Sequence, residues 1–348
     1  MLSSMWHRVQ RLNPVYLVWG LILVYAAFFS CFTVLRHYTF NTSAYDLGIF
    51  MQAFSSTLHG NGFLYTNLWE GARFARHFGP IILLVLPFYA IWERAETLLI
   101  IQSCWLGLGA LPIYWIAKKE LGEEKIGLAF ALLYLAYPAL HGMNRFDFHE
   151  LSLAPTFILF AFHFWGEKKW KRAITLIVFA LLCREDVALA VVPMGANWLW
   201  QRRRQWSWRD KETVLSASVC IVGAIWFGLT LFVVIPYFNQ GGYFYTKGYN
   251  PLNILEDMEE KGRYLFDLFA PLIFIPLFNH LILLALPVLA QGMFSTNRTR
   301  FRIDNQHPAL LVPFVFLSGI YAIKGISEHL DEKTRQAFYK RLAPLVMI

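Results

Sequence analysis

Charged residues are scarce in this chain: Asp, Glu, Lys and Arg make up 16% of its 348 residues, against about 25% in an ordinary soluble domain. Apolar residues make up 57% and aromatic residues 17%. A soluble domain of this length has too little interior to hide so much apolar surface from water. The composition therefore excludes a soluble globular domain, a disordered chain and a small disulfide scaffold.

The sequence also has few cysteines and lacks the short motifs of soluble enzymes. Its four cysteines show no CxxC spacing and sit in or beside apolar runs, which is typical of buried free thiols. There is no P-loop, no HExxH, no GxSxG and no GxGxxG followed by a helix. The chain therefore has no sequence mark of a nucleotide-binding enzyme, a zinc protease or an α/β-hydrolase.

Long apolar runs are what the sequence has in abundance. They are continuous, which is typical of membrane helices rather than of the alternating strands of a barrel. We expect an all-α, polytopic transmembrane protein with about 9–11 apolar helical segments, some of them re-entrant or interfacial. It would form one integral membrane domain, 1–348, with outer loops at 36–77 and 236–263. The apolar runs lie near 14–35, 78–92, 97–117, 126–142, 151–165, 173–183, 187–200, 213–235, 264–278, 280–294 and 308–323.

The basic residues lie between these runs. The chain carries 31 basic and 23 acidic residues, a net charge of +8. Positive charge in membrane proteins gathers in cytoplasmic loops, so the excess indicates topology rather than nucleic-acid binding. If the short run 78–92, which holds two prolines, does not cross, all the basic clusters fall on one side. This topology predicts a multi-pass plasma-membrane protein with a cytoplasmic N-terminus. The clusters are 118–125, 168–172, 202–211 and 324–341.

Three other segments bear on this topology. The run 14–35 is long for a cleavable signal and has no clear cleavage site, so it predicts the first transmembrane helix. Residues 173–200 begin and end beside basic clusters, which favours a hairpin of two short helices over one long helix with buried charges. Whether 78–92 and 173–200 span or re-enter stays open. The run Leu342–Ile348 starts an apolar stretch and stops, so the chain is either truncated there or ends in a short interfacial piece.

Polar residues next to the membrane ends gather on the outer face in this topology. The segment 145–150 is the most specific, because four ionisable residues alternate with two Phe. The group 184–186 is either functional or a self-neutralising structural group. Alone, Asp46 is also an ordinary residue at the start of a helix, and His77 an ordinary interfacial one. The gathered residues are Asp46, His77, Asp147, His149, Glu150, Arg184, Glu185, Asp186 and His307.

The order of several motifs resembles one family. The chain carries YDLGIFMQAFSSTLHGNG, HFGPIILLVLPFYAIW, ALPIYWIAKKELG, FDFHEL and LLCREDVAL, and later FDLFAPLIFIPLF, ALPVLAQGMFST and HPALLVPFVFL. Together they resemble a family of uncharacterised prokaryotic membrane proteins, catalogued as domain of unknown function 2079. The resemblance covers about residues 40–320.

This family is grouped with the GT-C glycosyltransferases, multi-span enzymes that use sugars linked to polyprenyl phosphate on the outer face of the membrane. The resemblance implies a GT-C-like fold, and implies that Asp46 is the base or metal-linked carboxylate that activates the acceptor. The segment His77–Pro80 resembles a polar-residue-then-proline element of related enzymes. GT-C members often carry paired acids where Ala44 and Tyr45 precede Asp46 here, so the partner acid must come from elsewhere. The candidates for it are Asp147, Glu150 and Glu185.

We therefore expect transfer of a hexose or pentose from a polyprenyl-phosphate donor to an acceptor on the extracytoplasmic face of the lipid bilayer. The expected catalytic residues are Asp46, His77 and Glu150. The expected substrate-binding residues are Arg145, Arg184, Glu185, Asp186 and His307. A divalent ion, Mg²⁺ or Mn²⁺, is expected at Asp147 and His149. The alternatives are a transporter or flippase with ionisable residues along its path, and a membrane protein without catalysis.

Overall fold

Helices make up most of the computed structural model, which describes residues 14–43, 45–243, 245, 248–331 and 333–339. Within these residues, four helical segments are long and apolar enough to cross a membrane: Pro14–Tyr38, Ala95–Leu121, Lys211–Asn239 and His307–Glu328. A fifth candidate is a pair of helices, Glu124–Leu135 and Pro138–Arg145, bent by 42°. The prediction of an all-α, polytopic membrane protein is confirmed, whereas the predicted extent of a single domain stays a prediction. The prediction about Leu342–Ile348 falls outside the described residues.

Each long segment contains one or more labelled elements. The first is α2 (Pro14–Tyr38), and the second joins α5 (Ala95–Leu108) to α6 (Ala110–Leu121). The third runs from α12 (Lys211–Leu229) through the π-helical turn η5 (Thr230–Val234) to α13 (Ile235–Asn239). The fourth joins the 3₁₀ turn η12 (His307–Leu310) to α16 (Val312–Glu328), and the bent pair is α7 (Glu124–Leu135) and α8 (Pro138–Arg145).

Shorter elements lie between these segments. The helices are α3 (Asp46–Leu58), α4 (Ile82–Ile91), α9 (Ala154–Gly166), α10 (Trp170–Leu181), α11 (Ala188–Gln201), α14 (Met258–Phe269) and α15 (Leu286–Met293). The 3₁₀ turns near the site are η1 (Arg73–Ala75), η2 (Glu150–Leu153), η3 (Glu185–Val187) and η11 (Arg298–Phe301). The others are η4 (Arg203–Gln205), η7 (Pro251–Leu255), η8 (Ala270–Leu272), η9 (Ile275–Phe278) and η10 (His280–Ala285). The strands β1 (Tyr65–Thr66) and β2 (Gly71–Ala72) form a small antiparallel hairpin.

Two predictions about short segments can be compared with these helices. The helix α4 has ten residues and contains Pro87, fewer than the roughly 20 residues that a full crossing needs. It is too short to span a bilayer as one straight helix, and whether 78–92 spans or re-enters stays a prediction. The segment 173–200 forms two helices, α10 and α11, separated by residues 182–187, which include Arg184–Asp186. The two-helix prediction is confirmed, and the single long helix is wrong.

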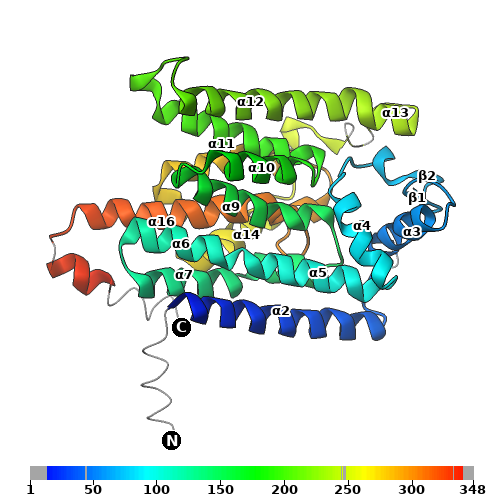
Figure 1. Cartoon of the computed structure of the whole chain (residues 1–348), viewed down its shortest axis with the longest axis horizontal. Coiled ribbons are helices and arrows are strands. Elements are labelled where there is room, and N and C mark those ends of the chain that lie inside the picture. Colours follow the sequence, from blue (N-terminus) through cyan, green and yellow to red (C-terminus); the bar gives the residue numbers. More distant parts are fainter. Residues whose placement is uncertain (1–13, 44, 244, 246–247, 332, 340–348) are drawn as a thin grey trace, which may run out of the picture.

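The helices pack side by side along the long axis of the molecule, so the bundle has two distinct ends (Figure 1). At one end, Lys119 Nζ lies 2.7 Å from Glu167 Oε1, and Lys324 Nζ lies 2.7 Å from Glu120 Oε2. We call this the basic end. The other end, which we call the site end, carries α3, the β-hairpin and the start of α4.

The outermost helices keep one apolar face inside and one outside. In α2 the buried side chains follow helical spacing, from Val18 and Ile22 to Phe29, and pack against α5. The opposite face of α2 exposes Val24 and Phe28, and α12 exposes a similar apolar face. Exposed apolar faces of this extent are suited to lipid rather than to water.

Candidate functional site

The site end contains a polar cavity of about 510 Å³. Its walls come from α2, α3, the β-hairpin, α8 and the segment 297–307, which are far apart in the sequence. Six of the predicted residues line it: Asp46, His77, Arg145, His149, Arg184 and His307. Seven arginines also line it: Arg36, Arg73, Arg76, Arg145, Arg184, Arg300 and Arg302. We call it the cationic cavity, because Asp46 and Asp304 are its only carboxylates among the described lining residues.

The other four predicted residues lie behind this lining and hold it in place. Glu150 Oε1 lies 2.7 Å from Arg73 Nη2, and Glu185 Oε1 lies 2.6 Å from His77 Nδ1. The carboxylate of Asp186 accepts two hydrogen bonds from Arg184, at 2.8 and 2.5 Å. Asp147 Oδ2 accepts a hydrogen bond from the Ser43 amide at 2.5 Å. Three of these carboxylates therefore position a cationic or aromatic side chain, and Asp147 fixes the backbone before α3; none of the four lines the cavity.

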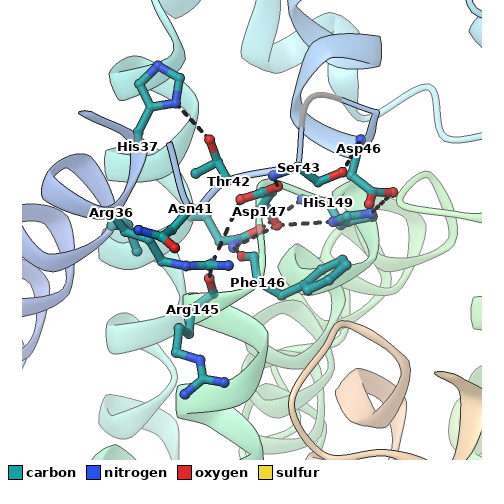
Figure 2. A network of polar contacts seen from close by, with 12 residues as sticks. Arg36, His37, Asn41, Thr42, Ser43, Asp46, Arg145, Phe146, Asp147 and His149 are labelled. Carbon is teal, nitrogen blue, oxygen red and sulfur yellow. Dashed lines mark hydrogen bonds and ion pairs between the residues drawn. The ribbon is translucent and has the colours of Figure 1, made fainter. Parts of the chain in front are cut away.

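Asp46 and His149 form the first of two pairs that can move protons. Asp46 is the first residue of α3, and its amide donates to Ser43 Oγ at 3.0 Å. Its Oδ1 lies 3.6 Å from His149 Nε2, while His149 Nδ1 donates to the Asp147 carbonyl at 3.0 Å (Figure 2). Burial opposes ionisation of Asp46, but His149, Ser43 and Arg73 together lower its pKa below the ordinary value. Asp46 is therefore an ionised carboxylate held at the cavity wall.

His77 and Glu185 form the second pair. Besides His77, Glu185 accepts hydrogen bonds from the Phe78 amide and the Tyr243 hydroxyl, both at 3.0 Å. The His77 ring stacks on Tyr245, with the ring centroids 4.7 Å apart. Burial and then the positive charges of Arg184 and Arg73 lower the pKa of His77 well below its ordinary value. A neutral His77 donates Nδ1–H to Glu185, which leaves Nε2 as a proton acceptor.

Close backbone contacts fix the segments that carry these side chains. A Cβ at Gly79 would lie 2.4 Å from the Cys183 carbonyl oxygen, and the Ile81 amide donates to the Leu182 carbonyl at 2.9 Å. A Cβ at Gly142 would lie 1.9 Å from the Ile303 carbonyl oxygen. Only glycine permits contacts this close, so the two glycines hold the His77 turn and α8 against their neighbours.

An apolar groove of about 410 Å³ adjoins the cationic cavity. Its walls include Phe28, Phe29 and Phe32 of α2 and Pro138 of α8. Arg145 and Asp304 line both the groove and the cavity. The groove therefore meets the cavity at these two residues, beside the exposed apolar face of α2.

Sequence reasoning missed six charged residues of this lining: Arg36, Arg73, Arg76, Arg300, Arg302 and Asp304. Three of them, Arg36, Arg73 and Arg76, are arginines in the predicted outer loop 36–77, where positive-inside sorting leaves few basic residues. That exception was the signal that could have found them. Arg73 is the clearest case, because it is buried and its Nε and Nη1 have no hydrogen-bond partner among the described residues.

The divalent ion expected at Asp147 and His149 stays a prediction. Asp147 Oδ2 is taken by the Ser43 amide, and His149 Nε2 faces Asp46. In the part of the chain that the structure describes, no group of three His, Cys, Asp or Glu residues is placed to hold a metal ion. These residues therefore do not form a metal cage by themselves.

The fold and the site together define a class: this is a multi-span α-helical membrane protein with a polar, arginine-rich cavity at one end. Over residues 36–348, the chain matches the family described as "Predicted membrane protein (DUF2079)". It belongs to this family. No curated protein and no solved structure matches the chain.

Proposed function

We propose that this protein is a GT-C-type glycosyltransferase, which transfers a sugar from a polyprenyl-phosphate donor to a hydroxyl of an acceptor. One observation carries the proposal: the cationic cavity meets the apolar groove at Arg145 and Asp304. A donor of this class has the same two parts, an anionic phosphate joined to a long apolar chain. The cavity suits the phosphate, and the groove suits the first units of the chain.

The arginines support binding of a phosphate. A guanidinium group presents a planar set of donors that matches phosphate oxygens, and it keeps its charge at any ordinary pH. Arg73 and Arg184 are already oriented by Glu150 and Asp186. Arg73 also keeps two buried N–H groups without a partner among the described residues. A phosphate oxygen would satisfy such donors.

The groove supports binding of the prenyl chain. Its phenylalanines lie on α2, a helix whose outer face is apolar and exposed. A lipid would reach the groove sideways from the bilayer, without crossing a polar surface. This arrangement favours a lipid substrate over a water-borne sugar nucleotide.

The proposed reaction uses Asp46 as the proton acceptor and the arginines of the cavity as the phosphate-binding groups. The acceptor oxygen forms a bond to the anomeric carbon of the sugar while the bond from that carbon to the phosphate oxygen breaks. Asp46, assisted by His149, takes the proton of the acceptor hydroxyl. The polyprenyl phosphate leaves with the electron pair, and the arginines stabilise its negative charge. No step in this scheme passes through a metal ion.

The charge distribution supports an orientation. Basic clusters lie around the ends of α6 and α9 at the basic end, and positive charge marks the cytoplasmic side. The site end would then face the extracytoplasmic side of the cell membrane, and the N-terminus the cytoplasm. This agrees with an enzyme that uses lipid-linked rather than nucleotide-linked sugars.

The substitution Asp46→Asn tests the proposal. Purified full-length protein in vesicles is given a radiolabelled polyprenyl-phosphate sugar together with membrane acceptor lipids and glycans. Wild type should form labelled product, and Asp46→Asn should form it about 10²–10⁴-fold more slowly, because the general base is lost. The matched control is Glu93→Gln, an exposed carboxylate that does not line the cavity.

Two outcomes would contradict the proposal. Equal product formation by wild type and Asp46→Asn would remove Asp46 from the chemistry. Movement of the intact labelled lipid between leaflets by wild type, without sugar transfer, would instead establish the flippase alternative.

A further inference from the structure

A second cavity of about 540 Å³ lies beside the cationic cavity. Its walls are the β-hairpin residues 69–71, the residues 75–76 of η1 and its end, and residues 238–242 at the end of α13. Trp69 and Arg76 line both cavities. These two side chains therefore form the boundary between the cavities, with Arg76 lying over the Trp69 ring at 5.6 Å.

The frame of this second cavity is fixed by hydrogen bonds across its walls. The side-chain Nδ2 of Asn239 donates to the carbonyls of Ala75 and Gly242, both at 3.1 Å. Its Oδ1 accepts from the backbone N–H of Gly241 at 2.8 Å. The Trp69 indole donates to the Ala72 carbonyl at 3.3 Å. These polar groups hold the walls and are not available to a ligand.

Two side chains of the lining remain available. Glu70 and Gln240 are exposed, and among the described residues no ion pair or side-chain hydrogen bond engages either of them. Both have left-handed backbone conformations, with φ of 53° and 55°. Glu70 lies in the turn between β1 and β2, and Gln240 is the C-terminal cap of α13, where this conformation is common. The cavity therefore offers one carboxylate and one amide beside an indole ring.

The charge of this cavity differs from that of its neighbour. Glu70 and Arg76 are its only charged lining residues among those described, so their formal charges cancel. The cationic cavity holds seven arginines against two aspartates. An anion is therefore drawn to the first cavity, and a neutral molecule rich in hydroxyl groups suits the second.

We propose that this second cavity binds a carbohydrate as the acceptor of the transferred sugar. Its hydroxyl groups donate to Glu70 and exchange hydrogen bonds with Gln240, while its apolar ring face packs on Trp69. This proposal rests on the function proposed above and adds the chemical class of the acceptor. A sugar hydroxyl that passes the Trp69 boundary enters the cavity that Asp46 lines.

The position of the base supports this assignment. Tyr45 directly precedes Asp46, and its ring centroid lies 6.3 Å from that of Trp69. The proton-accepting carboxylate is thus one residue from a side chain that contacts the boundary. The prenyl groove meets the cationic cavity elsewhere, at Arg145 and Asp304. Donor and acceptor would therefore enter from separate openings.

Photo-crosslinking of full-length protein in vesicles tests the proposal. The probe is a diazirine derivative of the neutral disaccharide maltose, and a diazirine derivative of glycerol phosphate is the anionic counterpart. Mass spectrometry should locate maltose labelling in residues 66–77 and 236–243. Glu70→Gly and Gln240→Gly should each lower this labelling by about tenfold, because each removes the side chain that hydrogen-bonds the sugar.

Gln240→Gly separates loss of binding from loss of folding, because glycine adopts the left-handed conformation without strain. Gln205→Ala, a substitution of an exposed glutamine in η4, is the matched control and should leave labelling unchanged. Labelling of this cavity by glycerol phosphate but not maltose, or by neither probe, would overturn the proposal. So would maltose labelling that neither cavity variant lowers.

A second measurement on the same samples separates this proposal from the function on which it rests. Radiolabelled farnesyl phosphate should bind wild type and both cavity variants equally. Farnesyl phosphate binding without maltose labelling would overturn the acceptor cavity and leave the lipid-phosphate site intact. Absence of farnesyl phosphate binding would overturn both.

Discussion

Two ion pairs, one at each end of the bundle, differ sharply in their burial. At the site end, Arg184 and Asp186 form a bidentate pair whose side chains are only 4% and 3% exposed. At the basic end, Lys118 pairs with Glu124, and these side chains are 44% and 46% exposed. Both are ion pairs between sequence neighbours, but water screens one and not the other. Burial therefore decides how much the loss of one partner of each ion pair costs in stability.

This difference bears on what the charges are for. The exposed Lys118–Glu124 pair at the basic end stays hydrated and costs little to place. The Arg184–Asp186 pair at the site end is buried at a large desolvation cost, so each charge needs partners that satisfy it. Glu150, Glu185 and Asp186 serve as such partners.

The largest expected effect comes from breaking the buried pair. Arg184→Met should lower the free energy of unfolding by about 3–5 kcal/mol, because it leaves the Asp186 carboxylate buried without its cation. Lys118→Met at the exposed pair should cost less than about 1 kcal/mol. Thermal unfolding of both variants in the same detergent measures the difference. Equal losses of stability would contradict the contrast between the ends.

A smaller effect on stability is expected from the protonation of His77 at low pH. The unfolded chain takes up a proton at His77 near pH 6.5, whereas its lowered pKa keeps the folded chain neutral there. Acidification below about pH 6.5 therefore favours unfolding, by up to about 1.4 kcal/mol per pH unit from this group. This part of the stability is fully present above pH 6.5 and is lost as the pH falls.

His77→Gln should accordingly show a shallower loss of stability between pH 7.5 and 5.5 than wild type. His59 is the matched control, since it is an exposed histidine paired with an exposed glutamate. His59→Gln should leave the pH dependence as in wild type. If the stability of His77→Gln fell with pH as steeply as that of wild type, groups other than His77 would cause the acid sensitivity.

Much of the fold could be predicted from the sequence, because membrane helices leave a direct signal in apolar length. The crossing segment α2 and the paired short helices α10 and α11 are examples. The sorting of basic clusters to one end follows from the same physics. The boundaries within 264–294 could not be predicted, because short 3₁₀ turns there interrupt apolar runs that look continuous.

The candidate site could be predicted only in part. Asp46, His149 and Arg184 were found because polar residues beside apolar runs are conspicuous. The split between residues that face the cavity and carboxylates behind it could not be predicted, since it depends on distances such as Glu150 to Arg73. Arg300 comes from a distant segment, and only tertiary packing brings it to the cavity.

The central claim is that the cationic cavity and the apolar groove together bind one lipid phosphate. Equilibrium binding of radiolabelled farnesyl phosphate to wild type, Arg145→Gln and Arg203→Gln tests this claim most directly. Arg145 lines both spaces, whereas Arg203 lies over Trp200 beyond the end of α11. Loss of a charge-assisted phosphate contact should weaken binding by about tenfold or more in Arg145→Gln, with no change in Arg203→Gln. Equal binding by all three proteins would contradict the account.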